Sequence, residues 1–427
     1  RDSNQRALRL GYDYTREHHD CPLPCRVARM DATEGSILID GNTAAALGCL
    51  YAGATVAAWY PITPSTSLMD AFTKYCAKYR RDPDTDRNTY LVLQAEDELA
   101  SIGMVLGAAW AGARAFTSTS GPGISLMGEL LGMGYYAEIP AVVFDVQRAG
   151  PSTGMPTRVQ QADILTCAYA SHGDTKHLLL FPGNPTECFD LSVQAFDLAD
   201  RFQTPVIVLS DLDIGMNDWV TPALQWDDTR VPDRGRVLGA EELAAMPVFH
   251  RYMDEDADFV TPRTLPGVTA KGAYFARGSG HNREGAYTEV PDEYQEVVDR
   301  LARKHAAAAA HMPAPVIERR AGARFGVVTV GSCDLAVREA LETLAARESP
   351  ADYMRVRGFP FGEEVREFLD THALLFVVEQ NRDAQLRSLL VLETEVAKEK
   401  LRSVLVYGGF PLSARDVIAG ITEQLGA

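Results

Sequence analysis

Hydroxyl side chains lie between and after two prolines in a short turn of this chain. Residues 60–66 read Tyr-Pro-Ile-Thr-Pro-Ser-Thr and directly follow the apolar run 56–59. Each proline fixes its φ angle and removes a backbone donor, so the turn is stiff. It would hold Thr63, Ser65 and Thr66 at the carboxyl end of a strand, where open α/β sheets bind their ligands. The alternative is a proline-capped helix start with Ser65 or Thr66 as its N-cap.

Three carboxylates gather in a second segment, Gln-Ala-Glu-Asp-Glu at 94–98, which ends a predicted strand and opens a helix predicted over 98–111. Carboxylates in a first helical turn interact favourably with the helix dipole, which is a purely structural explanation. The helix also contains Gly103, Gly107 and several alanines, which allow close packing. A carboxylate on it could therefore be buried, where desolvation favours the neutral acid. Both interpretations stay open.

An arginine opens a third segment, Arg-Ala-Gly-Pro-Ser-Thr-Gly-Met-Pro-Thr-Arg at 148–158, which follows a strand predicted over 141–146. The planar guanidinium fork of Arg148 suits a carboxylate. Thr153 and Thr157 would add hydroxyl donors beside it. Before it, Thr-Ser-Thr-Ser-Gly-Pro-Gly at 117–123 is typical either of an anion site or of a tight turn between strand and helix.

The elements that must position these residues alternate between strand and helix from residue 35 onward. Strands are predicted over 36–39, 56–59, 90–93, 115–119, 141–146, 177–181 and 205–209, and later over 325–330, 353–356, 374–378 and 403–406. Helices are predicted over 43–52, from the turn at 60–66 to about 78, and over 98–111, 124–136, 185–201 and 413–425. Such repeated units indicate an α/β fold with a parallel sheet covered by helices on both faces.

The same pattern predicts the domain organisation. Residues 1–34 show no clear period and are interpreted as an extended lead-in or linker. We expect a first domain over 35–265, a connecting segment over 266–315 and a smaller α/β domain over 316–427. The connecting segment contains a charged helix that begins near Asp292 and ends in a run of alanines.

Composition excludes several classes of function. The formal charge of −17 argues against nucleic acid or an anionic membrane surface as partner, and no apolar run is long enough to cross a bilayer. Seven scattered cysteines without a Cys-x-x-Cys pair, and no signal-like start, predict a cytoplasmic location. Cys21 and Cys25 bracket Pro-Leu-Pro, which we interpret as a proline-rich linker rather than a zinc site. Because the chain begins with Arg1 rather than methionine, we expect residues upstream of it.

The four motifs, in this order and spacing, resemble the α subunits of 2-oxoacid:ferredoxin oxidoreductases, and most of all their 2-oxoglutarate branch. The resemblance continues through 263–267, 278–281 and 354–357, and so covers the chain from about residue 35 to its end. It implies that the first domain is of the type that holds the aminopyrimidine ring of thiamine diphosphate. The last domain would be similar to the C-terminal domain of transketolases.

The resemblance also implies cofactor-binding and catalytic residues. Glu98 matches the glutamate that stands beside the pyrimidine ring and assists proton transfer there, and Glu96 is the competing candidate. Pro61 and Ile62 would contact the cofactor. Thr63 matches the hydroxyl that faces the substrate carbonyl.

Substrate binding is implied in the same way. Arg148 matches the arginine that grips the substrate carboxylate, with Thr153 and Thr157 beside it. Gly41 and Asn42 are further candidates for the same site. The second carboxylate of 2-oxoglutarate would need a second cation, for which Arg114, Arg158 and His281 are the candidates that the sequence offers.

The implied function is CoA-dependent oxidative decarboxylation of 2-oxoglutarate to succinyl-CoA, or the reverse carboxylation, with electrons exchanged with ferredoxin. A β subunit would hold the pyrophosphate, Mg²⁺ and a [4Fe–4S] cluster, since this chain has neither Gly-Asp-Gly nor suitably spaced cysteines. A γ domain or subunit and a dimer of heteromers are further expectations. The alternatives are pyruvate or another 2-oxoacid as substrate, a non-oxidative thiamine diphosphate enzyme, and a non-catalytic scaffold subunit.

Overall fold

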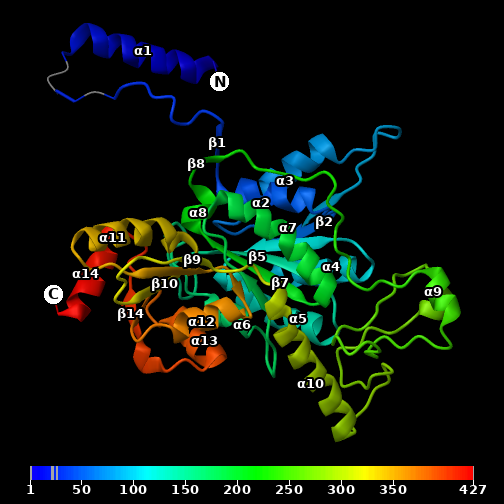
Figure 1. Ribbon diagram of the computed structural model, residues 1–427. Coiled ribbons are helices and arrows are strands. Elements are labelled where there is room, and N and C mark those ends of the chain that lie inside the picture. Colours follow the sequence, from blue (N-terminus) through cyan, green and yellow to red (C-terminus); the bar gives the residue numbers. More distant parts are fainter. Residues whose placement is uncertain (1, 21–23, 26, 427) are drawn as a thin grey trace.

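The computed structural model describes residues 2–20, 24–25 and 27–426. Cys21, and with it the interpretation of the Cys21–Cys25 segment, lies outside the described residues. Helix α1 (Asp2–His18) buries none of its residues and lies apart from the body of the molecule (Figure 1). The prediction of an extended lead-in is therefore wrong for this stretch. Its glutamine, arginine, leucine and glutamate residues favour a helix locally, although no other element of the described structure covers them.

A seven-stranded sheet organises the first part of the chain. Its strand order is β12-β6-β7-β5-β4-β2-β3, and all neighbours are parallel except β12 and β6. The strands are β2 (Val56–Trp59), β3 (Leu91–Gln94), β4 (Ala115–Thr119), β5 (Ala141–Gln147), β6 (Leu178–Leu180), β7 (Pro205–Asp211) and β12 (Gly358–Phe359). The predicted parallel sheet is confirmed, with an antiparallel edge strand that comes from the predicted last domain.

One predicted strand lies outside this sheet. β1 (Ser36–Ile39) has the predicted bounds, but it pairs with β8 (Trp219–Pro222) in a separate antiparallel ribbon. The sequence around β8 gave no clear periodic signal, so its pairing with β1 was not predicted.

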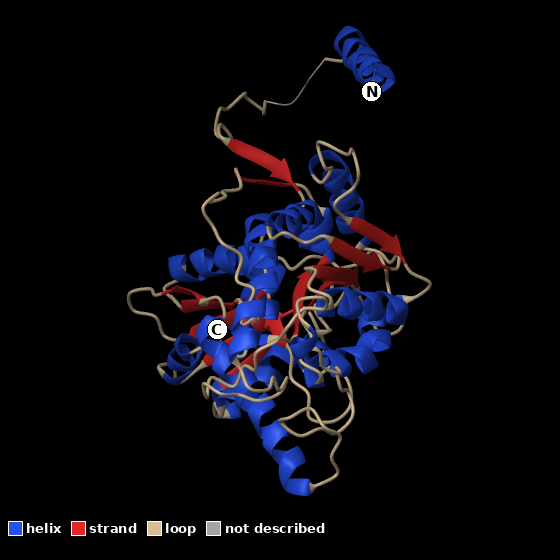
Figure 2. Ribbon diagram, turned by 90° about the vertical axis from the view of Figure 1, so that its right-hand side faces the viewer, coloured by secondary structure: helices blue, strands red, loops and turns tan. Residues whose placement is uncertain are grey.

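Helices cover both faces of the seven-stranded sheet, as the alternating pattern predicted; Figure 2 shows the strands between them. On one face lie α2 (Gly41–Tyr51), α3 (Thr66–Tyr79) and α7 (Pro185–Phe202), and on the other lie α4 (Glu98–Trp110), α5 (Gly121–Tyr136) and α6 (Ile164–Ala168). Successive residues of β5 alternate between these faces: Val142 and Phe144 join one buried cluster and Val143 joins the other.

The last part of the chain forms a five-stranded sheet in the order β14-β13-β10-β11-β9, parallel except for β9. Its strands are β9 (Val316–Glu318), β10 (Gly326–Val330), β11 (Asp352–Val356), β13 (Leu375–Glu379) and β14 (Leu401–Leu405). Helices α11 (Asp334–Ala346) and α14 (Ala414–Leu425) cover one face. Helices α12 (Glu363–Asp370) and α13 (Gln385–Thr394) join the cluster that also contains α4, α5 and α6.

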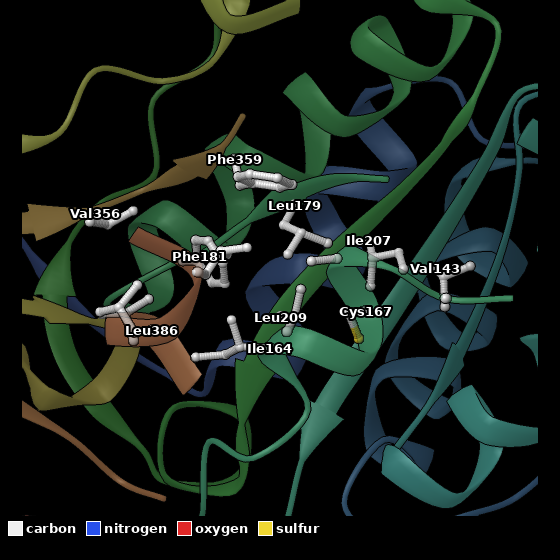
Figure 3. Packing of buried hydrophobic residues seen from close by; sticks show 14 of the residues in the cluster. Val143, Ile164, Cys167, Leu179, Phe181, Ile207, Leu209, Val356, Phe359 and Leu386 are labelled. Atoms are coloured by element: carbon white, nitrogen blue, oxygen red, sulfur yellow. The ribbon is translucent and has the colours of Figure 1, made fainter. Parts of the chain in front are cut away.

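One continuous apolar cluster therefore connects the two sheets. Figure 3 shows residues of the seven-stranded sheet, such as Leu179 and Ile207, in the same cluster as Val356 and Leu386 from the last part of the chain. Because the cluster is shared, the two sheets are packed together rather than joined by a flexible linker. The domain boundaries given above stay a prediction.

The segment between β8 and α10 (Pro291–Ala307) is mostly irregular, with only short α9 (Ala240–Ala245) and one 3-10 turn. Buried charges anchor α10 to the end of α5. Lys304 donates to Glu138 over 2.8 Å, and Arg300 donates to the same carboxylate. Burial would raise the pKa of Glu138, but these two cations hold it well below its usual range.

Within the described ranges, no helix combines the length and the apolar character that a membrane span requires.

Candidate active site

The carboxyl ends of four neighbouring strands, in the order β5-β4-β2-β3, form one edge of the larger sheet. Each is followed by one of the motifs found in the sequence: 60–66 after β2, 94–98 at the end of β3, 117–123 at the end of β4 and 148–158 after β5. Four segments that are up to about a hundred residues apart in the chain thus meet at the edge where open α/β sheets bind ligands.

Glu98 is the first residue of α4 and points into the protein. Asp97 is the N-cap and accepts a 2.6 Å hydrogen bond from the backbone N–H of Ala100. The favourable interaction with the helix dipole is therefore made by Asp97. Glu98 is only 6% exposed, whereas Glu96 is exposed. Within the described part of the chain, the Glu98 carboxylate has no hydrogen-bond or ion-pair partner. Its oxygens are absent from the buried unpaired atoms, so they reach solvent while the rest of the side chain is covered, which leaves them accessible to a ligand.

Gly123 lets α5 approach Glu98. A Cβ atom at this position would overlap Thr119 Oγ1 and lie 2.9 Å from Glu98 Cγ. The glycine in the Gly-Pro-Gly turn is therefore required by the close contact between the starts of α4 and α5 and the end of β4.

Gly123→Ala should consequently destabilise the protein by about 1–3 kcal/mol, the range for overpacking a tight site. Gly128→Ala is the matched control on the same helix, because its nearest neighbour would be 3.8 Å away. The control should be neutral or stabilising by up to about 1 kcal/mol, since alanine favours the helix. Urea denaturation of both variants measures the difference. Equal stability of the two variants would contradict the close contact.

Arg148 links two loops at this edge. It is 7% exposed, and its Nη1 donates to the Thr63 carbonyl over 2.7 Å while its Nη2 donates to the Thr153 carbonyl over 3.2 Å. Its Nε is buried without a partner in the described structure. Burial lowers the pKa of Arg148, and the charge of Asp163 opposes this shift. Because an arginine stays protonated, free N–H groups remain for an anionic ligand.

Arg148 also lines a cavity of about 370 Å³ between the two sheets. The walls come from the start of α5, the loop after β5, Asp163, and the loop before α13, including Asn381 and Arg382. The Glu379 carboxylate and the Gln161 carbonyl both accept hydrogen bonds from Asn381, which fixes this loop. No local pattern in the sequence indicated that the last part of the chain contributes to this cavity.

The other candidates at 60–66 and 153–157 lie at the surface of the same edge. Pro61, Thr63, Thr153 and Thr157 are exposed, and Ile62 is half-buried. Only backbone atoms of Thr63 and Thr153 contact Arg148.

The alternative interpretation of residues 60–66, a helix start with Ser65 or Thr66 as N-cap, is correct about where the helix begins. Ser65 is the N-cap residue of α3, but its side chain donates to the Ile62 carbonyl over 3.1 Å instead of capping the helix. The turn thus has a structural role, which is compatible with a ligand at its exposed side.

Gly41 and Asn42 support the turn from α2. Asn42 Nδ2 donates to the Pro64 carbonyl over 2.9 Å and to Ser67 Oγ over 2.8 Å. A Cβ at Gly41 would lie 2.6 Å from the Ile214 carbonyl oxygen. Both residues are therefore next to the site, and their contacts are with protein groups.

Two of the three candidate cations for a second carboxylate lie elsewhere. Arg114 precedes β4, at the opposite edge of the sheet, and pairs with Asp197 over 2.7 Å and Asp200 over 2.9 Å. His281 is buried against Tyr252, with ring centroids 4.0 Å apart. Arg158 is the candidate that shares the loop of Arg148, and its guanidinium lies 5.4 Å from the Phe410 ring centre.

Sequence reasoning missed two carboxyl groups near this site: Asp145, which is fully buried, and Asp163, which is half-buried and lines the same cavity as Arg148. Asp145 interrupts the otherwise apolar strand Ala-Val-Val-Phe-Asp-Val, and that interruption was the available signal. A charged residue in a strand buried on both faces needs a partner, so it marks a site worth attention.

The sequence and the fold are both similar to those of known proteins. A family model described as "Pyruvate flavodoxin/ferredoxin oxidoreductase, thiamine diP-bdg" matches residues 47–233. The 2-oxoacid:ferredoxin oxidoreductase 2 subunit alpha of Aeropyrum pernix is 33% identical over 99% of this chain and 66% of its own length. The 2-oxoglutarate synthase subunit KorA of Methanothermobacter thermautotrophicus is 32% identical over 80% of this chain and 87% of its own.

A solved structure agrees with these relatives. The 2-oxoglutarate:ferredoxin oxidoreductase from Magnetococcus marinus superimposes with a TM-score of 0.87 at 29% identity, over 99% of this chain and 71% of that chain. Its description names bound 2-oxoglutarate, coenzyme A and succinyl-CoA. The chain spans 61–66% of the length of four of the curated relatives. The resemblance carried by the four motifs and the α/β fold predicted from the alternating strands and helices are both confirmed.

Proposed function

The chain belongs to the family of 2-oxoacid:ferredoxin oxidoreductase α subunits, and we propose that it serves in CoA-dependent oxidative decarboxylation of 2-oxoglutarate to succinyl-CoA, with electrons passed to ferredoxin, or in the reverse reaction. The observation that carries this proposal is the meeting of two buried groups at one sheet edge. Arg148 offers free N–H groups to an anion, and Glu98 is a carboxylate without a protein partner.

The residues present fit the aminopyrimidine end of thiamine diphosphate. Glu98 is only 6% exposed and has no hydrogen-bond or ion-pair partner among the described residues, so its carboxyl group is free to bind a ring nitrogen. Pro61 and Ile62 would contact the ring from the neighbouring turn. When bound, the cofactor supplies a nucleophilic carbon and an electron sink for decarboxylation. The pyrophosphate, Mg²⁺ and a [4Fe–4S] cluster would be held by a β subunit, and CoA would enter as co-substrate.

Each side chain then has a defined task. The Glu98 carboxyl holds a proton at the pyrimidine N1′ atom and so assists acid–base exchange there. The free N–H groups of Arg148 bind the C1 carboxylate of the 2-oxoacid. The Thr63 hydroxyl donates to the keto oxygen, and the hydroxyls of Thr153 and Thr157 add donors around the carboxylate. Of these residues, Arg148 lines the cavity between the sheets, where a bound carboxylate would be partly covered.

Partner subunits complete the proposed enzyme. The outer faces of α4 and α5 expose large apolar side chains, namely Leu99, Met104, Leu126 and Met133. A group of exposed apolar residues next to a site is typical of an interaction surface. We place the β subunit there, with a γ domain or subunit, ferredoxin as electron carrier, and a dimer of heteromers as the assembly.

The test is anaerobic reduction of ferredoxin by this chain co-expressed with its β partner. Thiamine diphosphate, Mg²⁺ and CoA are supplied, and 2-oxoglutarate, pyruvate and a branched 2-oxoacid are compared. We expect CoA-dependent reduction, fastest with 2-oxoglutarate. If another acid reduced ferredoxin faster, the proposed reaction would stand and the proposed substrate would change to that acid. Failure with every acid, in a complex whose cluster is intact, would favour the non-oxidative or scaffold alternatives.

A further inference from the structure

Two carboxyl side chains meet beside Arg148. Asp145 is completely buried on β5, and Asp163 immediately precedes α6 and lines the same cavity as Arg148. Cys167 holds the two residues together, because its thiol donates to Asp145 Oδ2 and its backbone N–H donates to the Asp163 carbonyl oxygen over 2.8 Å. Burial and the neighbouring Asp163 carboxyl group raise the pKa of Asp145. Asp145 Oδ1 and Asp163 Oδ2 are buried, and neither receives a hydrogen bond from a permanent donor of the described structure. Two adjacent carboxyl groups in a buried site avoid carrying two negative charges when they share one proton.

The groups around this pair determine its charge. Cys167 of α6 donates its thiol to Asp145 Oδ2 over 3.6 Å. A Cβ at Gly121, the first residue of α5, would lie 2.8 Å from both oxygens of Asp163, so the start of α5 covers that carboxyl group. Arg148 is the cation that acts on Asp163, although among the described residues no ion pair within 4 Å joins them.

The remaining neighbours leave the pair with one negative charge. Arg382 and Asp383, on the far wall of the cavity, form an ion pair over 2.7 Å. Their opposite charges therefore nearly cancel at the Asp145–Asp163 pair. Burial, together with the two carboxyl groups, raises the pKa of the Cys167 thiol, which therefore stays neutral.

We propose that Asp145 and Asp163 share one proton and oppose the charge of Arg148, so that an anionic substrate bound at Arg148 draws a second proton from water onto the pair. This inference rests on the proposed function, because the anion is the carboxylate of the proposed 2-oxoacid. Asp163 is thereby a residue that adjusts the charge at Arg148. No bond other than the O–H bond on Asp163 is formed, and no oxidant or reductant is needed.

Charge balance gives the physical reason. Without substrate, the single negative charge of the pair is matched by Arg148. A bound carboxylate adds a second negative charge in a buried site, where charges interact strongly, and the pair can remove the excess by taking up a proton. The proton goes to Asp163, the member of the pair that is ionised near neutral pH.

The sign of the pH dependence follows. Burial raises the pKa of Asp163 to about 6, and the charge of Arg148 opposes this. A bound anion raises this pKa further, so binding favours the protonated pair. The affinity for the anion is therefore highest below about pH 6, and it falls as the pH rises from there to the higher pKa that Asp163 has in the complex. Each unit by which the bound anion raises the pKa weakens binding about tenfold across this window.

The experiment measures binding rather than turnover. The probe is N-oxalylglycine, which has the two carboxylates of 2-oxoglutarate and an amide carbonyl that resists attack. Its carboxyl groups are ionised throughout pH 5.5–8, so they do not contribute to the pH dependence. The complex with the β subunit is titrated calorimetrically across this range in two buffers of different protonation enthalpy. We expect proton uptake on binding near pH 6.5 and a Kd that weakens by about tenfold or more by pH 8.

Variants separate the inference from the proposed function. Asp163→Asn should bind the probe without proton uptake and with one Kd at all pH values, while Cys167→Ala should keep the wild-type pH dependence. Asp145→Leu, which has a similar size but removes the carboxyl group that lowers the pKa of Asp163, should move the pH dependence to higher pH. It replaces the first variant if Asp163→Asn fails to fold. Binding without proton uptake in the wild type, or an unchanged pH dependence in Asp163→Asn, would overturn this inference alone. No binding of the probe at any pH would overturn the proposed function and this inference with it.

Discussion

Replacing Glu98 by glutamine in the complex with the β subunit is expected to slow deprotonation at the thiazolium C2 atom of bound thiamine diphosphate by about 10²–10⁴-fold. Glutamine keeps the size and shape of the side chain, but its amide cannot hold or release a proton at the pyrimidine N1′ atom. Exchange of the C2 proton for deuterium, followed by NMR after rapid quenching, measures the effect directly. Ferredoxin reduction should fall in parallel.

Glu96 provides the matched control, because it lies two residues away in the same segment. It is exposed, whereas Glu98 is buried at the first turn of α4 beside Gly123. Glu96→Gln should change the exchange rate by less than about twofold, as an exposed group outside the site would. Normal exchange in Glu98→Gln together with slow exchange in Glu96→Gln would move the role to Glu96. Thiamine diphosphate affinity, measured in both variants, separates lost binding from lost proton transfer.

The parts of the site that could be predicted are those that local sequence determines. The strands at 56–59 and 115–119 are short apolar runs bounded by turn residues, and the structure has them with the predicted bounds. Because the carboxyl ends of parallel strands share an edge, the loops with Thr63, Glu98 and Arg148 could be expected to meet there. The structure joins Thr63 and Arg148 directly through a hydrogen bond.

The parts that could not be predicted depend on contacts between distant segments. Strand β12 has two residues, and only its pairing with β6 makes it a strand. Arg114 has the same chemistry as Arg148, yet it precedes its strand rather than following it, and its aspartate partners lie more than eighty residues away. No local pattern distinguishes a buried structural arginine of this kind from one that binds a ligand.

Helix α1, in contrast, forms without contacts to distant segments of the described structure. Its residues favour a helix locally, but most of them are polar and all of them are exposed, so the helix lacks the apolar content of a buried helix. The prediction failed because it looked for helices that pack against a core, and this helix packs against none within the described structure.

Arg148→Ala is expected to lower kcat/KM for a 2-oxoacid by roughly 30- to 5,000-fold, the equivalent of about 2–5 kcal/mol for removing one member of a buried charge pair. The loss should be similar for 2-oxoglutarate and pyruvate, because both present the same C1 carboxylate. Steady-state ferredoxin reduction with each acid measures it. Thiamine diphosphate binding should be unchanged, since the proposed cofactor contacts lie on Glu98 and the turn at 60–66.

The guanidinium of Arg148 also joins the loops of Thr63 and Thr153, so a structural contribution must be separated from substrate binding. Arg158→Ala is the matched variant, because this cation belongs to the same loop but makes its side-chain hydrogen bond only to its neighbour Thr157. If Arg158 binds the second carboxylate, its loss should impair 2-oxoglutarate alone and leave pyruvate unaffected. A loss in Arg148→Ala that appears only as weaker thiamine diphosphate binding would contradict the carboxylate role. Undiminished turnover at low substrate concentration would contradict it as well, because a carboxylate clamp contributes most where binding limits the rate.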